Sequence, residues 1–185
     1  MARSRTGPRA AGRAPSAAPL QSLASATRPR VWQGIGYRPL PDPAPARTLF
    51  DFAALPWPPS PDLAFGWGAF APSEGGERLI GALVGEQHGP AALLHGPVVV
   101  AGADPLEIAS QLVAAALDHA TAAGAATLFA RPQGLDRVWV RFGFIPVPES
   151  TLPAGLAGRA GAGLFAWRGG SALWSPREAA ANPGA

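Results

Sequence analysis

The clearest pattern of hydrophobic positions lies in the middle of the chain, between residues 104 and 124. Positions suited to burial recur there every three or four residues, the spacing of one helical face, at Ile108, Leu112, Ala115, Ala116, His119 and Ala123. Asp104-Pro105-Leu106-Glu107 supplies an N-cap, a proline at the first helical position and an acid at the third, and Gly124 supplies a stop. The pattern therefore predicts a helix between Asp104 and Gly124.

Apolar runs of strand length precede and follow this helix. They cover residues 35–40, 63–71, 79–85, 91–100, 126–130, 144–148 and 163–167. Two shorter helices are predicted, one that begins at Asp42-Pro43 and one over residues 134–142. This order predicts a mixed α/β domain in which residues 91–130 form a right-handed strand–helix–strand crossover.

Two joints in this arrangement have a specific geometry. Residues 86–90 join the strands 79–85 and 91–100 as a hairpin. Gly96-Pro97 interrupts the second of these strands. Because proline cannot donate to a strand ladder, we expect a bulge or a splayed edge at this point.

The two ends of the chain differ from the middle. Residues 1–30 are rich in Ala, Ser, Arg and Pro, so burial cannot offset their ordering entropy and we expect a disordered tail. An Arg-rich, acid-free segment also fits a transit peptide or a nucleic-acid-binding arm. We expect residues 169–185 to be a flexible C-terminal tail, which leaves residues 31–168 as the folded domain.

Charge and composition exclude several classes of function. Six of the fifteen basic residues, all arginines, lie in residues 1–30, so residues 31–185 carry a net charge of −3. An acidic body disfavours nucleic acid as its partner, and all-Arg usage with abundant Ala, Gly and Pro is typical of a GC-rich, bacterial-like genome. The absence of Cys excludes disulfides, thiolate metal sites and a Cys nucleophile. Without a long apolar run or a secretory segment, we expect a cytoplasmic protein with no membrane partner.

The second half of the chain resembles the GCN5-related N-acetyltransferase (GNAT) superfamily. The resemblance rests on the segment Ile108–Ala130, on Trp139-Val-Arg-Phe-Gly-Phe-Ile-Pro-Val147, and on Tyr37-Arg-Pro-Leu-Pro-Asp-Pro43 as a first strand and helix start. It covers roughly residues 35–168. It implies a GNAT-like acyl-CoA N-acyltransferase fold, α/β (mixed α+β), with a central mixed sheet of about six to seven strands flanked by helices.

The resemblance also implies a reaction and a cofactor site. In this family an acyl group passes from acetyl-CoA, or another acyl-CoA, to an amine, and the pantetheine lies between splayed fourth and fifth strands. Carried over, Val98, Val99 and Val100 hold the pantetheine arm. The following loop holds the pyrophosphate through backbone amides, and the remaining cofactor contacts fall on Ile108, Ala109, Trp139 and Arg141.

The sequence departs from the family pattern in two places. The family loop Arg/Gln-x-x-Gly-x-Gly/Ala reads Asp104-Pro-Leu-Glu107-Ile-Ala109 here, which puts a carboxylate where a glycine lets phosphate approach. The family tyrosine that protonates the leaving thiolate falls at Trp139, whose indole cannot act as an acid. No metal is expected, because the three His have no acid cluster at ligand spacing.

His95 is the candidate general base, because it is the only titratable side chain in the predicted fourth strand. We expect Glu86 and His88 to be solvated in the hairpin, His119 to lie at the margin of the core, and Trp57 and Trp67 to wall an acceptor pocket. The hypothesis is an N-acyltransferase of unknown acceptor, and a homodimer is compatible with the family. A catalytically inactive GNAT-fold binding protein, and a nucleic-acid-associated protein acting through the tail, stay open.

Overall fold

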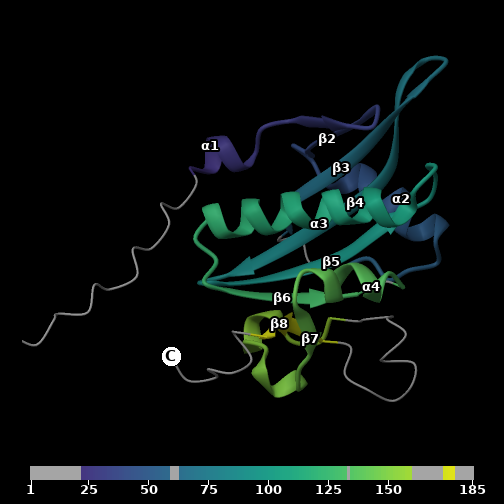
Figure 1. Ribbon diagram of the computed structural model, residues 1–185. Helices are drawn as coiled ribbons and strands as arrows, with labels where there is room; N and C mark the ends of the chain where they lie inside the picture. Colours follow the sequence, from purple (N-terminus) through teal and green to yellow (C-terminus); the bar gives the residue numbers. More distant parts are fainter. Residues whose placement is uncertain (1–21, 59–62, 133, 160–172, 178–185) are drawn as a thin grey trace, which may run out of the picture.

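One mixed sheet runs through the molecule, with helices on both of its faces (Figure 1). The computed structural model describes residues 22–58, 63–132, 134–159 and 173–177. Within these residues the sheet has eight strands in the order β1-β2-β3-β4-β5-β6-β8-β7. Their bounds are β1 Arg30–Trp32, β2 Ile35–Pro39, β3 Leu63–Ser73, β4 Gly76–His88, β5 Ala91–Val99, β6 Thr127–Arg131, β7 Phe144–Pro146 and β8 Trp174–Pro176.

The three predicted helices are present in the predicted order, and a further helix precedes them. The helices are α1 Leu23–Ala26, α2 Arg47–Phe52, α3 Pro105–Ala122 and α4 Asp136–Arg141, with 3-10 turns η1 Ala44–Ala46, η2 Glu149–Thr151 and η3 Ala154–Leu156. All strand pairs are antiparallel except β5 and β6, which α3 joins as a crossover. The expected mixed α+β class is confirmed, and the sheet has slightly more strands than the six to seven expected.

The additional strands lie at the two ends of the expected domain. Residues 22–30, which fall in the expected N-terminal tail, contain α1 and the first residue of β1. Strand β8 lies within the expected C-terminal tail and inserts between β6 and β7. Trp174 and Ser175 are buried there, and the Ser175 hydroxyl donates to the carbonyl of Leu128. A three-residue strand is too short to show periodicity, so only its burial in the sheet reveals it. The predicted strand 163–167 lies outside the described residues.

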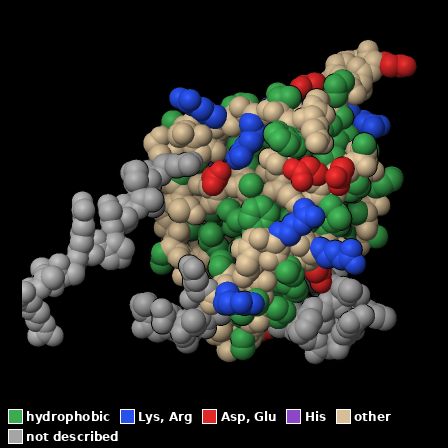
Figure 2. Space-filling model, in the orientation of Figure 1, with side chains coloured by type: hydrophobic (Ala, Val, Ile, Leu, Met, Phe, Trp, Pro, Cys, Tyr) green, Lys and Arg blue, Asp and Glu red, His purple; other side chains and the backbone are tan. Residues whose placement is uncertain are grey.

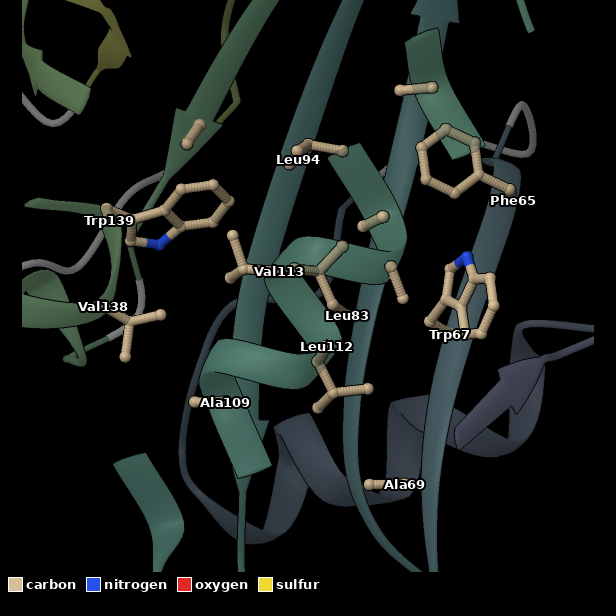
Figure 3. Packing of buried hydrophobic residues seen from close by; sticks show 14 of the residues in the cluster. Phe65, Trp67, Ala69, Leu83, Leu94, Ala109, Leu112, Val113, Val138 and Trp139 are labelled. Carbon is tan, nitrogen blue, oxygen red and sulfur yellow. The ribbon is translucent and has the colours of Figure 1, made fainter. Parts of the chain in front are cut away.

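Helix α3 covers one face of the sheet and forms the larger part of the core. Its N-cap, Asp104, accepts a hydrogen bond from the amide of Glu107 at 3.1 Å, as the sequence predicts. Ala109, Leu112 and Val113 point from α3 toward Leu83 of β4 and Leu94 of β5 (Figure 3). The same core contains the fully buried indoles of Trp67 and Trp139.

The opposite face of the sheet is covered in two separate patches. Helix α2 covers one patch, where Phe50 packs with Val84 and Val98 of the sheet. The turns η2 and η3 cover the other, whose members are Ala91, Leu93, Phe129, Val147, Leu152, Leu156 and Leu173. The buried polar side chains of β4, β5 and β6 lie on this same face, because side chains two residues apart on a strand point the same way: Glu86 follows Val84, and His95 follows Leu93.

Candidate functional site

Strand β6 pairs along its whole length with only the first half of β5. Their parallel register runs from Ala91 opposite Thr127 to His95 opposite Arg131, where β6 ends, while β5 continues to Val99. Opposite β4 the register also shifts, because the Ala82–Val98 and Val84–His95 pairs leave two β5 residues facing one β4 residue. These two are Gly96, with φ +105°, and Pro97, joined by a cis peptide bond. The expected bulge is therefore present. Beyond His95 this edge of β5 has no strand partner among the described residues, and we call this unpaired edge the gap.

The backbone at the end of β5 presents hydrogen-bonding groups to this gap. The amide of Val100 donates to the carbonyl of Ile80 at 2.9 Å, so it is occupied by β4. Because the backbone groups of successive strand residues point to opposite sides, those of Val98 also face β4 and those of Val99 face the gap. Of the three valines predicted to hold a pantetheine arm, Val99 is the one whose backbone faces the right way.

Trp139 lies at the gap on its α3 side. Helix α4 presents the indole, which is fully buried and packs edge-on against Phe144 with ring centroids 4.9 Å apart. Its Nε1 donates to the carbonyl of Gly96 at 3.1 Å. The carbonyl of Gly96, in the bulge, therefore already has a hydrogen-bond partner within this chain. Arg141, at the end of α4, is exposed and its guanidinium lies 3.4 Å from the hydroxyl of Ser110 on α3.

The start of α3 does not fit a diphosphate. The carboxylate of Asp104 already accepts the amide of Glu107, and Pro105 has no amide hydrogen to offer. The amide of Ile108 donates to the carbonyl of Asp104, and the side chains of Ile108 and Ala109 are buried in the core. The carboxylates of Asp104 and Glu107 lie at this helix N-terminus, where an anionic ligand would otherwise bind. Ile108 and Ala109, which were predicted as cofactor contacts, are thus core residues of the first turns of α3.

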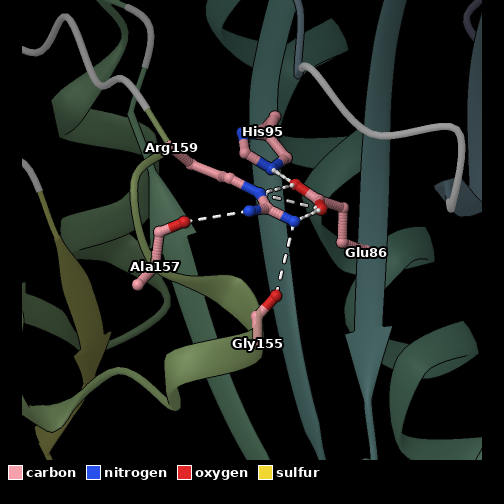
Figure 4. Close-up of polar contacts among 5 residues, drawn as sticks. All are labelled: Glu86, His95, Gly155, Ala157 and Arg159. Carbon is pink, nitrogen blue, oxygen red and sulfur yellow. Dashed lines mark hydrogen bonds and ion pairs between the residues drawn. The ribbon is translucent and has the colours of Figure 1, made fainter.

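A buried polar cluster lies on the opposite face of the sheet from α3. Nε2 of His95 lies 2.7 Å from Oε1 of Glu86, and both side chains are only 2% exposed. Arg159, which follows η3, donates from Nε at 3.0 Å and from Nη2 at 2.6 Å to Oε2 of Glu86. It is held in turn by the carbonyls of Ala157 and Gly155. Figure 4 shows the three side chains converging from β4, β5 and the segment after η3.

The charges in this cluster determine the protonation of His95. Burial by itself raises the pKa of Glu86, but hydrogen bonds and charges from His95 and Arg159 lower it to about 2. Burial lowers the pKa of His95, and the charges of Arg131 and Arg159 lower it further, against the opposing effect of Glu86. His95 is therefore neutral at neutral pH. Because ionised Glu86 can only accept, Nε2 carries the proton and Nδ1 carries a lone pair.

Nδ1 of His95 is the chemically available atom of the cluster. No residue in the described part of the chain hydrogen-bonds to it. A neutral imidazole that a carboxylate holds in one tautomer is the arrangement that a general base requires. His95 is also the last residue of β5 that pairs with β6, so it marks the point where the gap begins.

Glu86 is the residue that the sequence prediction misplaced. We expected a solvated hairpin side chain, but β4 continues to His88 and the loop is only Gly89-Pro90, so Glu86 pairs with Leu93 and is buried. Gly-Pro itself, with a glycine at the first loop position, was the available signal for a two-residue loop, and Gly89 has φ +56°. His88 is exposed, as expected.

The aromatic residues proposed for an acceptor pocket divide between the two faces. Trp67 belongs to the α3 side, where its Nε1 donates to Nδ1 of His119 at 3.2 Å. It therefore lies on the other side of the sheet from His95, which corrects the expectation. Trp57 packs edge-on against Phe50 of α2, with ring centroids 5.1 Å apart, on the face that carries His95. His119 stacks on Phe65 at the margin of the core, and burial lowers its pKa.

The polar cluster makes the stability of the protein depend on pH. Unfolded His95 titrates near its ordinary pKa of 6.5, whereas the folded side chain stays neutral to lower pH. The unfolded state then binds more protons, so the free energy of unfolding is expected to fall as the pH drops below 6.5. Glu86 adds a loss in the same direction as the pH falls from 4.5 toward about 2.

Urea unfolding of the protein between about pH 8 and pH 5 measures this dependence, which one group limits to about 1.4 kcal/mol per pH unit. His95→Gln is expected to reduce the slope below pH 6.5, with the remainder due to His119. His88→Gln, at an exposed position, is expected to leave the slope unchanged. Parallel profiles for wild type and His95→Gln would contradict the neutral, buried state of His95.

The described residues contain no group of three or more His, Asp or Glu side chains arranged to hold a metal ion. None of their helices has both the length and the apolar character that a membrane crossing requires.

Comparisons with known proteins give similarity in structure but none in sequence. No family profile and no curated protein matches the chain. N-acetylglutamate synthase from Neisseria gonorrhoeae, solved with coenzyme A and N-acetyl-glutamate, matches with a TM-score of 0.52 at 14% identity, over 79% of this chain and 35% of that one. A GNAT-family acetyltransferase from Staphylococcus aureus matches with a TM-score of 0.46 at 11% identity, over 60% of this chain and 66% of that one.

A probable GNAT-family acetyltransferase from Chromobacterium violaceum matches with a TM-score of 0.44 at 18% identity, over 72% of this chain and 82% of that one. This chain thus spans about a third of the length of the synthase and just under two thirds of the staphylococcal protein. At these identities the likeness concerns the fold.

Proposed function

We propose that this chain, which has the fold of the GNAT acetyltransferases, is an N-acyltransferase that moves an acyl group from an acyl-CoA-type thioester to an amine. The observation that carries the proposal is the neutral, buried His95, held by Glu86 in one tautomer at the point where β5 and β6 part. A site for amine acylation needs a base for the amine close to the thioester, and the position of His95 beside the unpaired edge of β5 supports the proposal.

The chain's own residues divide the proton chemistry among them. Nδ1 of His95 accepts the proton that the amine loses as it attacks the acyl carbon. Glu86 holds the opposite ring nitrogen and stabilises the imidazolium that then forms, while Arg159 keeps Glu86 ionised. Since Trp139 cannot protonate the departing thiolate, the acid available on the face that carries His95 is its own imidazolium. Tyr37, the only tyrosine, is buried on the α3 side, where burial and the charge of Glu107 raise its pKa to about 12.

The thioester would supply an activated acyl carbon and a thiol leaving group. The backbone groups of Val99 fit its pantetheine arm, since they face the gap and are not taken by β4. The start of α3 does not fit its diphosphate, for the reasons given above. The donor is therefore expected to be held through its pantetheine arm, with the nucleotide contributing little.

The test is thiol release from acetyl-CoA and from acetyl-pantetheine in the presence of a panel of primary amines. We expect amine-dependent release from both donors. Their kcat/KM values are expected to lie within about tenfold of each other, because the nucleotide of acetyl-CoA adds at most one favourable charged contact, which is worth about that factor. Glu107→Gln is expected to improve the use of acetyl-CoA several-fold and to leave acetyl-pantetheine unchanged. Glu77→Gln, an exposed acid away from the gap, serves as the control. Release that does not depend on any amine, from either donor, would overturn the proposal.

A catalytically inactive binding protein is the second candidate. Two observations favour it. The indole of Trp139 already donates to the carbonyl of Gly96 in the bulge, and Asp104 already caps α3. For this candidate, titration calorimetry with either donor would give no heat at millimolar concentration.

A nucleic-acid role has less support from the described surface. On the α3 face, arginines alternate with acidic side chains and form no continuous basic patch (Figure 2).

A further inference from the structure

Arg131 is a buried cation that forms an ion pair with a side chain at the surface. It is the last residue of β6, and its side chain is 3% exposed. Nη1 and Nη2 donate to the two carboxylate oxygens of Glu149 at 2.5 Å and 2.7 Å. Glu149 opens the three-residue turn η2 between Pro148 and Leu152, and its side chain is 54% exposed. The Glu149 carboxylate thus lies between the Arg131 guanidinium and solvent, and a ligand from solvent would reach the guanidinium by replacing it.

Arg131 also has a donor that nothing uses. Its Nε is buried, and among the described residues it has no hydrogen-bond partner. An unpaired buried donor of a charged group is costly, so such atoms in folded proteins call for an explanation. A ligand that takes the place of Glu149 and offers a further acceptor on the Nε side of the guanidinium would satisfy it.

The position of Arg131 connects it to the candidate base. It lies directly opposite His95 in the parallel register, where adjacent strands are separated by about 4.8 Å. Facing residues of a parallel pair project to the same side of the sheet, and the charge of Arg131 is one cause of the lowered pKa of His95. A group bound to Arg131 would therefore lie on the same face of the sheet as His95, beside the strand that carries it.

We propose that Arg131 binds a carboxylate of the acceptor molecule, which displaces Glu149 and brings the acceptor's amine to His95. This inference rests on the proposed function and narrows its acceptor to amines that carry a carboxylate, such as amino acids. We expect the ligand to be a carboxylate because Arg131 already binds one, that of Glu149, through a bidentate pair of hydrogen bonds. The exchange replaces one carboxylate by another, so the buried cation stays paired throughout.

Binding is tested first, with a readout that does not depend on activity. Glu149→Ala is titrated with propionate and, as a neutral ligand of the same shape, with propionamide, and the thermal unfolding midpoint is followed. Propionate is expected to raise the midpoint of Glu149→Ala at concentrations at least about tenfold lower than for wild type, and propionamide to have no effect. Glu77→Ala, which removes a carboxylate from the exposed Arg38, is the matched control and should behave like wild type. Equal responses of Glu149→Ala and Glu77→Ala would overturn the carboxylate site.

The second measurement compares acceptors that differ only in the carboxylate. Thiol release is followed with γ-aminobutyrate and with butylamine. We expect kcat/KM to be about tenfold or more higher for γ-aminobutyrate, and Arg131→Gln to bring the two values together. Equal use of both amines by an active protein would overturn this inference and leave the acyltransferase standing. No use of either amine, together with propionate binding to Glu149→Ala, would overturn the acyltransferase and support the anion site.

Discussion

The substitution His95→Gln is expected to lower kcat for amine acylation by about 10²–10⁴-fold, the usual contribution of a general base. The glutamine amide can still donate to Glu86 in place of Nε2, so the buried carboxylate keeps a partner. What the variant lacks is the lone pair of Nδ1. Because the amine then loses its proton to water alone, kcat is expected to fall while the KM for the thioester changes little.

Two controls separate this effect from damage to the fold. His88→Gln changes an exposed histidine at the end of the neighbouring strand β4, and it is expected to keep wild-type kcat. Urea unfolding of His95→Gln should show a cooperative transition, which confirms that the variant is folded when it is assayed. A folded His95→Gln protein with kcat within a factor of about three of wild type would show that His95 is not the base.

Glu86→Gln is expected to have the largest effect on stability. The carboxylate is 2% exposed and holds both His95 and Arg159. Neutralising it removes the carboxylate charge that faces the Arg159 guanidinium, which is itself only 20% exposed. Breaking a buried ion pair from one side typically costs 3–5 kcal/mol, so we expect a loss of about 3 kcal/mol in the free energy of unfolding. Urea unfolding at neutral pH measures it.

The matched control is Glu77→Gln, which removes the same charge from an exposed pair with Arg38. Exposed ion pairs contribute about 0–1 kcal/mol, so this variant should unfold close to wild type. If Glu86→Gln also stays within about 0.5 kcal/mol of wild type, the cluster does not hold the η3 segment to the sheet. Its role as the support of His95 would then be in doubt as well.

Local patterns were sufficient to predict most of the elements. Helix α3 follows from its capping residues and from the spacing of its apolar face, and it forms nearly where these signals predict. The central hairpin and the bulge at Gly96-Pro97 follow from residues that permit few other conformations. These features depend on interactions within a few residues, so they can be predicted without knowing the fold.

The site itself could be predicted only in part. His95 was chosen as the sole titratable side chain of its strand, and its role as a base stays a prediction. Its partners were not found, because Glu86 and Arg159 are 73 residues apart in sequence and meet only when η3 folds over the sheet. The pair of Arg131 with Glu149 could not be predicted either, because it depends on how the turn after β7 lies against β6.

The sequence by itself determined the kinds of elements, their order and the residues able to do acid–base chemistry. The tertiary structure decided which face each of these residues occupies. That choice buries Glu86, places Trp67 on the far side of the sheet from His95, and inserts β8 between β6 and β7. The physical reason is that a strand residue's environment depends on its register and on what covers its face. Both are set by contacts between segments far apart in the chain, which no local pattern records.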